Sequence, residues 1–141
     1  MYVYKVLVNA LPPTNKIKLV SLINQSSCTA MDPVSLTEYE YGIICQANAT
    51  YVGVILVRLQ KTDAKQKLIL DHFCVLPHQR RKKYATSMFE CLKSELNPTD
   101  RVDMRLNTLI PEWQVDLLER WGWQKSSDTA HEQEVMYTLT L

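Results

Sequence analysis

The sequence is poor in glycine: its 141 residues include only Gly42, Gly53 and Gly122, where average usage near 7% predicts about ten. Glycine-rich phosphate loops, including the dinucleotide-binding fingerprint, need several closely spaced glycines and are therefore excluded. No apolar run approaches the roughly 18 residues of a membrane span. The first residues also lack the basic and apolar stretches of a signal peptide. These absences predict a cytoplasmic protein with no membrane partner.

The chain carries little net charge of either sign, +1 from 16 basic and 15 acidic side chains. Duplex nucleic-acid binders usually have a strong basic excess, so no nucleic-acid partner is expected. Hydrophobic residues make up 46% of the sequence and charged residues 22%, which excludes disorder as the main state. The length fits one domain, and we expect residues 1–141 to form it around a substantial core.

The cysteines and histidines show no metal-ligand spacing. Cys28, Cys45, Cys74 and Cys91 are isolated from one another, without a C-x-x-C pair. Cys45 and Cys74 lie in strand-like runs and Cys91 in a helix-like run. The pattern favours buried thiols in a reducing compartment over a metal site. We therefore expect no metal. Cys74 as a covalent nucleophile is disfavoured because no general base is evident beside it.

Hydrophobic periodicity predicts an α/β domain in which helices flank a mixed, mostly antiparallel sheet. The expected order of elements is β-α-(α)-β-β-β-α-β-α-β. Asn48-Ala49 is expected to form a tight hairpin turn, and Gly122 to end the last helix. The expected strands span residues 2–9, 40–47, 50–61, 66–76, 101–107 and 133–141. The expected helices run from Thr14 to Gln25, over 33–38, from Arg80 to about Leu96, and from Pro111.

A run of four basic residues, Arg80 to Lys83, occurs where the central strand passes into the next helix. A helix N-terminus exposes unpaired N–H groups and a partial positive charge, so it binds anions. Cations at this end each cost about 0.3–1 kcal/mol, a penalty that a polyanionic ligand removes. The run therefore indicates either a polyanion site or a solvated basic turn.

Three segments together resemble the GNAT superfamily of acetyl-CoA-dependent N-acyltransferases. Val75-x-Pro77 followed by Arg80 and Ala85 is similar to the acetyl-CoA-binding motif V-x-P-x-x-R-G-x-G-x-G/A, in a degenerate form without its glycines. Residues 117–123, LLERWGW, resemble the L-Y-E-K-x-G-F segment at the end of the last helix. Residues 135–139 resemble the last strand. The resemblance covers about the whole chain and implies a single GNAT-like domain.

The resemblance implies that acetyl-CoA is the cosubstrate. Phe73, Cys74 and Val75 match the strand segment whose backbone pairs with the pantetheine arm. The pyrophosphate loop and the helix start match Arg80, Arg81, Lys82, Lys83, Tyr84, Ala85 and Thr86.

For catalysis, Asp71 matches a position where many members place a general base, and His72 beside it is the alternative. Asn107 is the candidate for binding the acceptor, an amine-bearing molecule. Neighbouring strand residues point to opposite faces, so at most one of Asp71 and His72 faces the acceptor.

The sequence departs from the family pattern at catalytically relevant positions. Arg81 and Lys83 replace glycines that allow a close approach of backbone to ligand. Leu118 stands where many members have a tyrosine that reprotonates the departing thiolate, and leucine cannot donate a proton. Tyr84 is close in sequence, but its place in the helical apolar stripe favours packing over acid catalysis.

Two functions follow. The first is an N-acetyltransferase that moves an acetyl or other acyl group to a primary amine of a small molecule, peptide or protein. The second is a non-catalytic relative that binds CoA or another protein, which the missing glycines and Leu118 favour. Either a monomer or a homodimer is compatible with the sequence.

Overall fold

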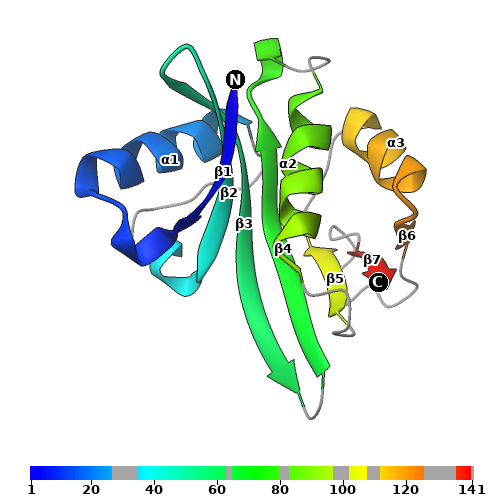
Figure 1. Cartoon of the computed structure of the whole chain (residues 1–141). Helices are drawn as coiled ribbons and strands as arrows, with labels where there is room; N and C mark the ends of the chain where they lie inside the picture. The colour runs from blue at the N-terminus through cyan, green and yellow to red at the C-terminus, as the bar shows by residue number, and fades with distance from the viewer. Residues whose placement is uncertain are drawn as a thin grey trace.

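The structure is a computed structural model that describes residues 1–26, 35–62, 65–79, 83–96, 102–107, 112–125 and 136–140 (Figure 1). Its strands are β1 (Tyr2–Leu7), β2 (Tyr41–Ala47), β3 (Thr50–Thr62), β4 (Lys65–Val75), β5 (Val102–Asn107), β6 (Gln124–Lys125) and β7 (Met136–Thr140). Its α-helices are α1 (Pro13–Ser26), α2 (Tyr84–Ser94) and α3 (Glu112–Arg120). Three short 3-10 helices are η1 (Val8–Ala10), η2 (Ser35–Glu38) and η3 (Pro77–Gln79).

The strands form one sheet in the order β1-β2-β3-β4-β5-β7-β6. All neighbours are antiparallel except β4 and β5, which are parallel. The predicted α/β class, mixed sheet and element order are therefore confirmed. The bracketed helix is the 3-10 helix η2. The sequence did not predict η1, η3 or the two-residue strand β6, because they are too short to show a period.

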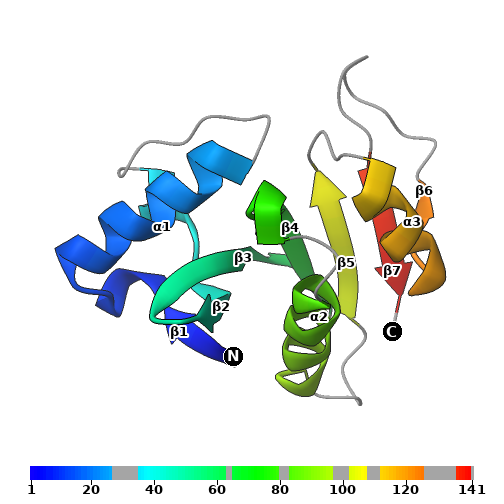
Figure 2. The ribbon, with the colours of Figure 1, turned by 90° about the horizontal axis from the view of Figure 1, so that it is seen from above.

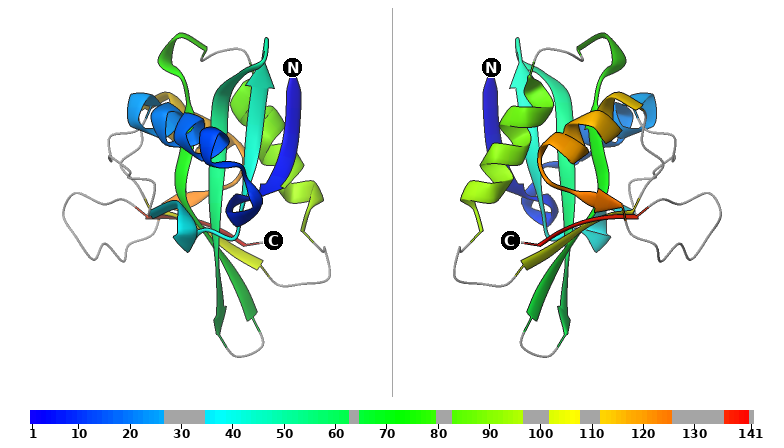
Figure 3. Two further views of the ribbon diagram at one scale, coloured as in Figure 1. Left: turned by 90° about the vertical axis from the view of Figure 1, so that its left-hand side faces the viewer. Right: turned by 90° about the vertical axis from the view of Figure 1, so that its right-hand side faces the viewer.

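The helices cover the sheet on both faces. Helix α1 packs on one face, against β3 and β4, and α2 packs on the other, against β1 to β4. Figures 2 and 3 show the two helices on opposite sides, with α3 beside the β5–β7 end of the sheet. The central strands β3 and β4 are thus buried between two layers, as the apolar residues on both faces of β4 led us to expect.

The turns follow from backbone conformations that few residues adopt readily. Asn48 and Ala49 have φ of 52° and 63°, which confirms the tight β2–β3 hairpin and matches the right-handed twist of the strands. Gly122 has φ of 89° just after α3, which confirms it as the residue that ends this helix.

Helix α2 begins later than the sequence indicated. We expected it to start at Arg80, but it starts at Tyr84, because Lys83 adopts the left-handed conformation with φ of 62°. A residue in this conformation cannot continue a right-handed helix, and a side chain there costs roughly 1 kcal/mol. The strained position is one of the two where the resembled motif has glycine. Lysine therefore keeps the backbone conformation that glycine normally provides.

Packing of α2 on the sheet depends on a glycine in β3. The buried face of α2 consists of Ala85, Met88, Phe89 and Leu92. A Cβ atom on Gly53 would lie 2.7 Å from Met88 Cε and 3.1 Å from the carbonyl oxygen of Cys74. Met88 is fully buried, so its methyl group has little room to move. Gly53 thereby sets how closely α2 approaches β3 and β4.

Gly53→Ala is expected to lower the free energy of unfolding by about 1–3 kcal/mol through overpacking. Urea denaturation of the wild type and the variant measures this loss. In a Met88→Ala background the closest clash is removed, so the added loss from Gly53→Ala should fall by at least half. An equal loss in both backgrounds would contradict the assigned clash.

Lys83→Gly is expected to raise the free energy of unfolding by about 0.5–1 kcal/mol relative to Lys83→Ala, because glycine adopts φ of 62° without a steric penalty. Both variants remove the same charge and differ only in the Cβ atom. Urea denaturation of the pair gives the difference. Equal stabilities would show that the Lys83 backbone is unstrained.

Candidate functional site

Strand β4 carries a β-bulge near its centre. Leu56 of β3 pairs with His72, whereas the next β3 residue, Val57, pairs with Leu70. Asp71 is therefore an extra residue that has no counterpart on β3. A bulge bends its strand and increases the local twist, and bulges often lie beside functional sites.

Beyond the bulge, β4 separates from β5. In the described part of the chain, the parallel ladder between them ends at the pair Leu70–Leu106. On the other side, β4 continues to pair with β3 as far as Val75. Among the described residues, the last part of β4 therefore pairs with a strand on one side only, and its unpaired edge faces the β5 side, where the ladder leaves a gap.

The ladder with β3 determines which β4 groups face this gap. The N–H of Leu76 donates to the carbonyl oxygen of Val52 at 2.9 Å, so the main-chain N–H and C=O groups of Leu76 point toward β3. The N–H and C=O groups of successive residues point to alternate edges of a strand. Those of Cys74 therefore also point toward β3, while those of Phe73 and Val75 point toward the β5 side. Of the three residues that the resemblance assigns to the pantetheine arm, Phe73 and Val75 thus direct their main-chain groups to the β5 side, and Cys74 directs its groups to β3.

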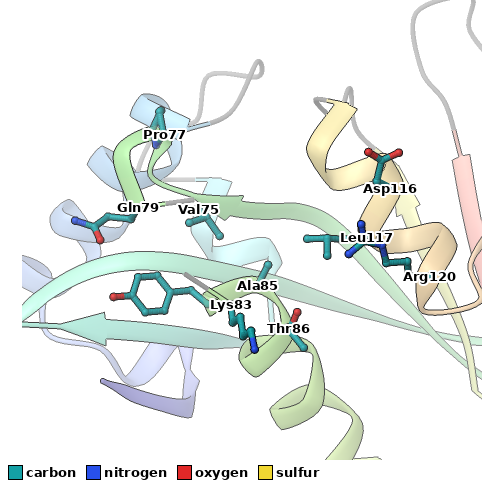
Figure 4. Close-up of a pocket in the computed structure, with 10 residues that line it drawn as sticks. Val75, Pro77, Gln79, Lys83, Ala85, Thr86, Asp116, Leu117 and Arg120 are labelled. Carbon is teal, nitrogen blue, oxygen red and sulfur yellow. The ribbon is translucent and has the colours of Figure 1, made fainter. Parts of the chain in front are cut away.

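A cavity of about 880 Å³ opens at this gap. Figure 4 shows Val75, Ala85 and Leu117 converging on it from β4, α2 and α3. Its walls are the end of β4 with η3, the first turn of α2, and one side of α3. The lining residues are Val75, Pro77, Gln79, Lys83, Tyr84, Ala85, Thr86, Asp116, Leu117 and Arg120.

The first turn of α2 gives the cavity an anion-binding wall. The amide of Ser87 donates to the carbonyl oxygen of Lys83, which is the first hydrogen bond of the helix. The amides of Tyr84, Ala85 and Thr86 therefore precede any intrahelical acceptor, and all three residues line the cavity. No acidic side chain occupies this turn. The exposed amides, the helix dipole and the Lys83 ammonium all favour a negatively charged group.

The α3 wall differs from the one that the sequence suggested. Leu118, aligned with the family tyrosine, is 0% exposed and belongs to the hydrophobic core. Its neighbour Leu117 lines the cavity instead, together with Asp116 and Arg120. Leu117 and Arg120 belong to the segment that resembles L-Y-E-K-x-G-F, but the sequence did not show that its side chains line a cavity, and nothing singled out Asp116.

An aromatic stack joins the walls of the cavity. The ring of Trp121, just after α3, lies 4.4 Å from that of Phe89 on α2, at an interplanar angle of 2°. Trp121 also stacks on Phe73 of β4, with ring centroids 6.0 Å apart. The Trp121 indole at the end of α3 therefore contacts side chains of both β4 and α2, and the stack helps to set the distances between these three elements.

His72 lies on the opposite face of the sheet. It is 7% exposed, and its ring meets the edge of Tyr39, the residue after η2, with centroids 6.0 Å apart. Phe73, the next residue, points to the α2 side, as the alternation of strand residues requires. His72 thus faces the α1 side of the sheet, across β4 from the cavity.

The structure places the remaining predicted residues only in part. Asp71 is located by its backbone in the bulge, and Asn107 by its pairing with Met136 on β7. The side chains of both lie outside the described residues. So do Arg80, Arg81 and Lys82. Their roles remain predictions.

Three of the four cysteines, Cys45, Cys74 and Cys91, belong to the described residues. Within the described residues, Cys45, Cys74 and Cys91 form no disulfide. Burial raises the pKa of the Cys45 thiol to about 11, so it stays protonated at neutral pH. The described part of the chain holds no cluster of three or more His, Cys, Asp or Glu side chains suited to a metal. It also contains no helix long and apolar enough to cross a membrane.

Comparison with known proteins finds similar solved structures but no similar sequence among family models or curated proteins. No protein-family model matches the sequence, and no curated protein matches it. Among solved structures, Arabidopsis thaliana Naa50 in complex with the bisubstrate analogue CoA-Ac-MVNAL is similar with a TM-score of 0.74 and 14% identity, over 100% of this chain and 99% of that one. The ribosomal-protein-S18-alanine N-acetyltransferase from Escherichia coli gives 0.67 and 12%, over 99% and 93%.

A third similar structure is the PaiA N-acetyltransferase from Thermoplasma acidophilum in complex with coenzyme A. It gives a TM-score of 0.69 and 12% identity over the full length of both chains. At such identities the likeness establishes the fold. In this chain, that fold contains the unpaired end of β4, the bulge at Asp71 and the cavity at the start of α2. The chain therefore has the fold of the GNAT superfamily of acetyltransferases.

Proposed function

We propose that the chain is an acetyl-CoA-dependent N-acetyltransferase that acylates a primary amine. The observation that carries this proposal is the cavity at the end of β4, which combines an open strand edge with an anion-binding helix start. Acetyl-CoA has the matching order of parts, because an amide-containing pantetheine arm follows a diphosphate.

The residues present fit this cosubstrate. Lys83 and the amides of Tyr84, Ala85 and Thr86 offer positive potential and N–H donors for the diphosphate. Val75 turns main-chain groups into the gap and can pair with the arm as a neighbouring strand would. The buried Val75 and Ala85 side chains and Leu117 provide an apolar lining for the arm.

The main-chain N–H of Val75 is positioned to stabilise the transition state. Attack of the amine nitrogen on the thioester carbonyl carbon forms a C–N bond and places negative charge on the carbonyl oxygen. A preorganised N–H directed at that oxygen stabilises the charge and commonly contributes about 10²–10³ in rate. Of the neighbouring amides of Cys74 and Val75, only that of Val75 faces the gap.

The acceptor amine must lose a proton before or during attack, because an ammonium ion has no lone pair. A free alkylamine has a pKa near 10.4 and is mostly protonated at neutral pH. Asp71 or His72 takes this proton, directly or through water. With His72 as the base, the amine would approach from the α1 side while the thioester arrives from the cavity side.

Collapse of the intermediate breaks the C–S bond and leaves a thiolate. The aligned tyrosine position holds the fully buried Leu118, so α3 gives the thiolate no proton from this position. Solvent then supplies the proton. Because positioning alone can provide a large effective molarity, this difference slows the reaction without abolishing it.

A peptide N-terminus is the acceptor that we propose first. The bisubstrate analogue of the Naa50 structure carries the peptide MVNAL, and the Escherichia coli protein is an alanine N-acetyltransferase for a ribosomal protein. These substrates belong to those proteins. They identify peptides that begin with Met-Val or with alanine as the first acceptors to assay, with lysine side chains and small amines next.

A second function, CoA binding without catalysis, is favoured by one feature. His72 is almost fully covered, with Tyr39 packed against it, so an amine does not reach its imidazole directly in this conformation. A protein that only binds acyl-CoA needs the cavity and not this face. Measured turnover distinguishes the two functions.

Thr86→Glu is expected to abolish acetyl-CoA binding while keeping or raising stability. A carboxylate in the first turn of α2 interacts favourably with the helix dipole but repels a diphosphate in the cavity. Saturating acetyl-CoA should stabilise the wild type by about 2.7 kcal/mol at a hundredfold excess over Kd, seen as a rise in Tm. Thr86→Gln, of similar shape but uncharged, should retain most of this shift.

ATP is the control ligand for this measurement, because it carries phosphates without the arm. No shift with acetyl-CoA, or an equal shift with ATP, would contradict the proposed cosubstrate.

Removing the general base is expected to lower kcat by about 10²-fold or more without changing acetyl-CoA affinity. Asp71→Asn and His72→Gln are the two variants, and thiol release with the peptide acceptors gives the rate. We expect one of them to show the full loss and the other to serve as its control. If wild type binds acetyl-CoA but releases no thiol with any acceptor, the binding function replaces the enzymatic one.

A further inference from the structure

Helix α3 presents two opposite charges to the cavity. Asp116 and Arg120 both line it, and they lie across from the Lys83 and Thr86 side of α2 (Figure 4). A spacing of four residues separates them by one helical turn, about 6 Å along the axis. The α3 wall is therefore acidic toward its start and basic toward its end.

Neither charge is taken up by an ion pair within the described residues. Asp116 and Arg120 are spaced as an i, i+4 pair, yet no contact within 4.0 Å joins their charged groups; in that part of the chain the ion pair formed is Lys5 with Glu95. Arg120 is exposed in the last turn of α3, where the helix dipole favours a cation. Its guanidinium is thus available to a ligand in the cavity.

We propose that Arg120 binds a phosphate group of the acyl-CoA from the α3 side, opposite Lys83. This rests on the proposed function and adds a binding residue on α3, outside the acetyl-CoA-binding motif of residues 75–85; Arg120 aligns with the lysine of the L-Y-E-K-x-G-F segment. Arginine presents a planar fork of donors that suits phosphate oxygens. Asp116 repels phosphate from its end of the wall, so the two charges together set the direction in which the nucleotide lies.

The decisive measurement is the Kd for CoA by titration calorimetry at low ionic strength and at about 1 M salt. Arg120→Gln is expected to weaken CoA binding about tenfold at low salt. This loss should shrink at 1 M salt, where the screening length falls to about 3 Å. A role limited to packing would give a loss that does not depend on salt.

Two variants serve as controls. Asp116→Asn changes the same helix and the same cavity, and it should leave CoA affinity unchanged or raise it. Lys18→Gln removes an equal charge from the exposed side of α1, on the other face of the sheet, and should have no effect. Unliganded Tm values within about 1 °C of wild type show that the variants fold normally.

Dephospho-CoA identifies which phosphate Arg120 binds. A loss for CoA but not for dephospho-CoA assigns the 3′-phosphate, and an equal loss for both assigns the diphosphate; either result supports the proposal. CoA affinity within twofold of wild type for Arg120→Gln, or a loss equal at both salt concentrations, overturns it. If wild type itself fails to bind CoA, the proposed function has failed as well, which separates the two outcomes.

Discussion

The separation of β4 from β5 after Leu70 and Leu106 is the constraint on which the site depends. Two parallel strands that stayed paired would leave no room for a third extended chain between them. The extra residue Asp71 bends β4 away, while its pairing with β3 keeps the strand in the sheet. The open edge is then available because α2, α3 and η3 surround it as cavity walls without filling it.

Much of the fold followed from hydrophobic periodicity, because long, strongly patterned segments leave few alternatives. The strands and helices appeared in the expected order, and Asn48-Ala49 formed the expected turn. The bulge at Asp71 could not be seen, since β4 is apolar on both faces and a one-residue change of register leaves no mark in such a pattern. Lysine rarely adopts a left-handed backbone, so nothing in residue type placed the start of α2 at Tyr84.

The candidate site was predictable where a motif existed and not elsewhere. Five of the residues that the resemblance singled out, Val75, Lys83, Tyr84, Ala85 and Thr86, line one cavity. The resemblance did not distinguish Val75 from Cys74, because the direction of main-chain groups depends on the register with β3. Asp116, Leu117 and Arg120 were missed, since which side of α3 meets the cavity is decided by tertiary packing and not by local sequence.

The stack of Trp121 on Phe89 and Phe73 has a consequence for how a ligand enters. The Trp121 ring contacts one ring from β4 and one from α2, which restricts how far these two elements and the end of α3 can move relative to one another. The cavity is therefore formed before the ligand binds, and its walls lose little conformational freedom on binding. Affinity then depends on how well the shape of the ligand fits the cavity, and the aromatic stack also limits the size of the ligand that the cavity accepts.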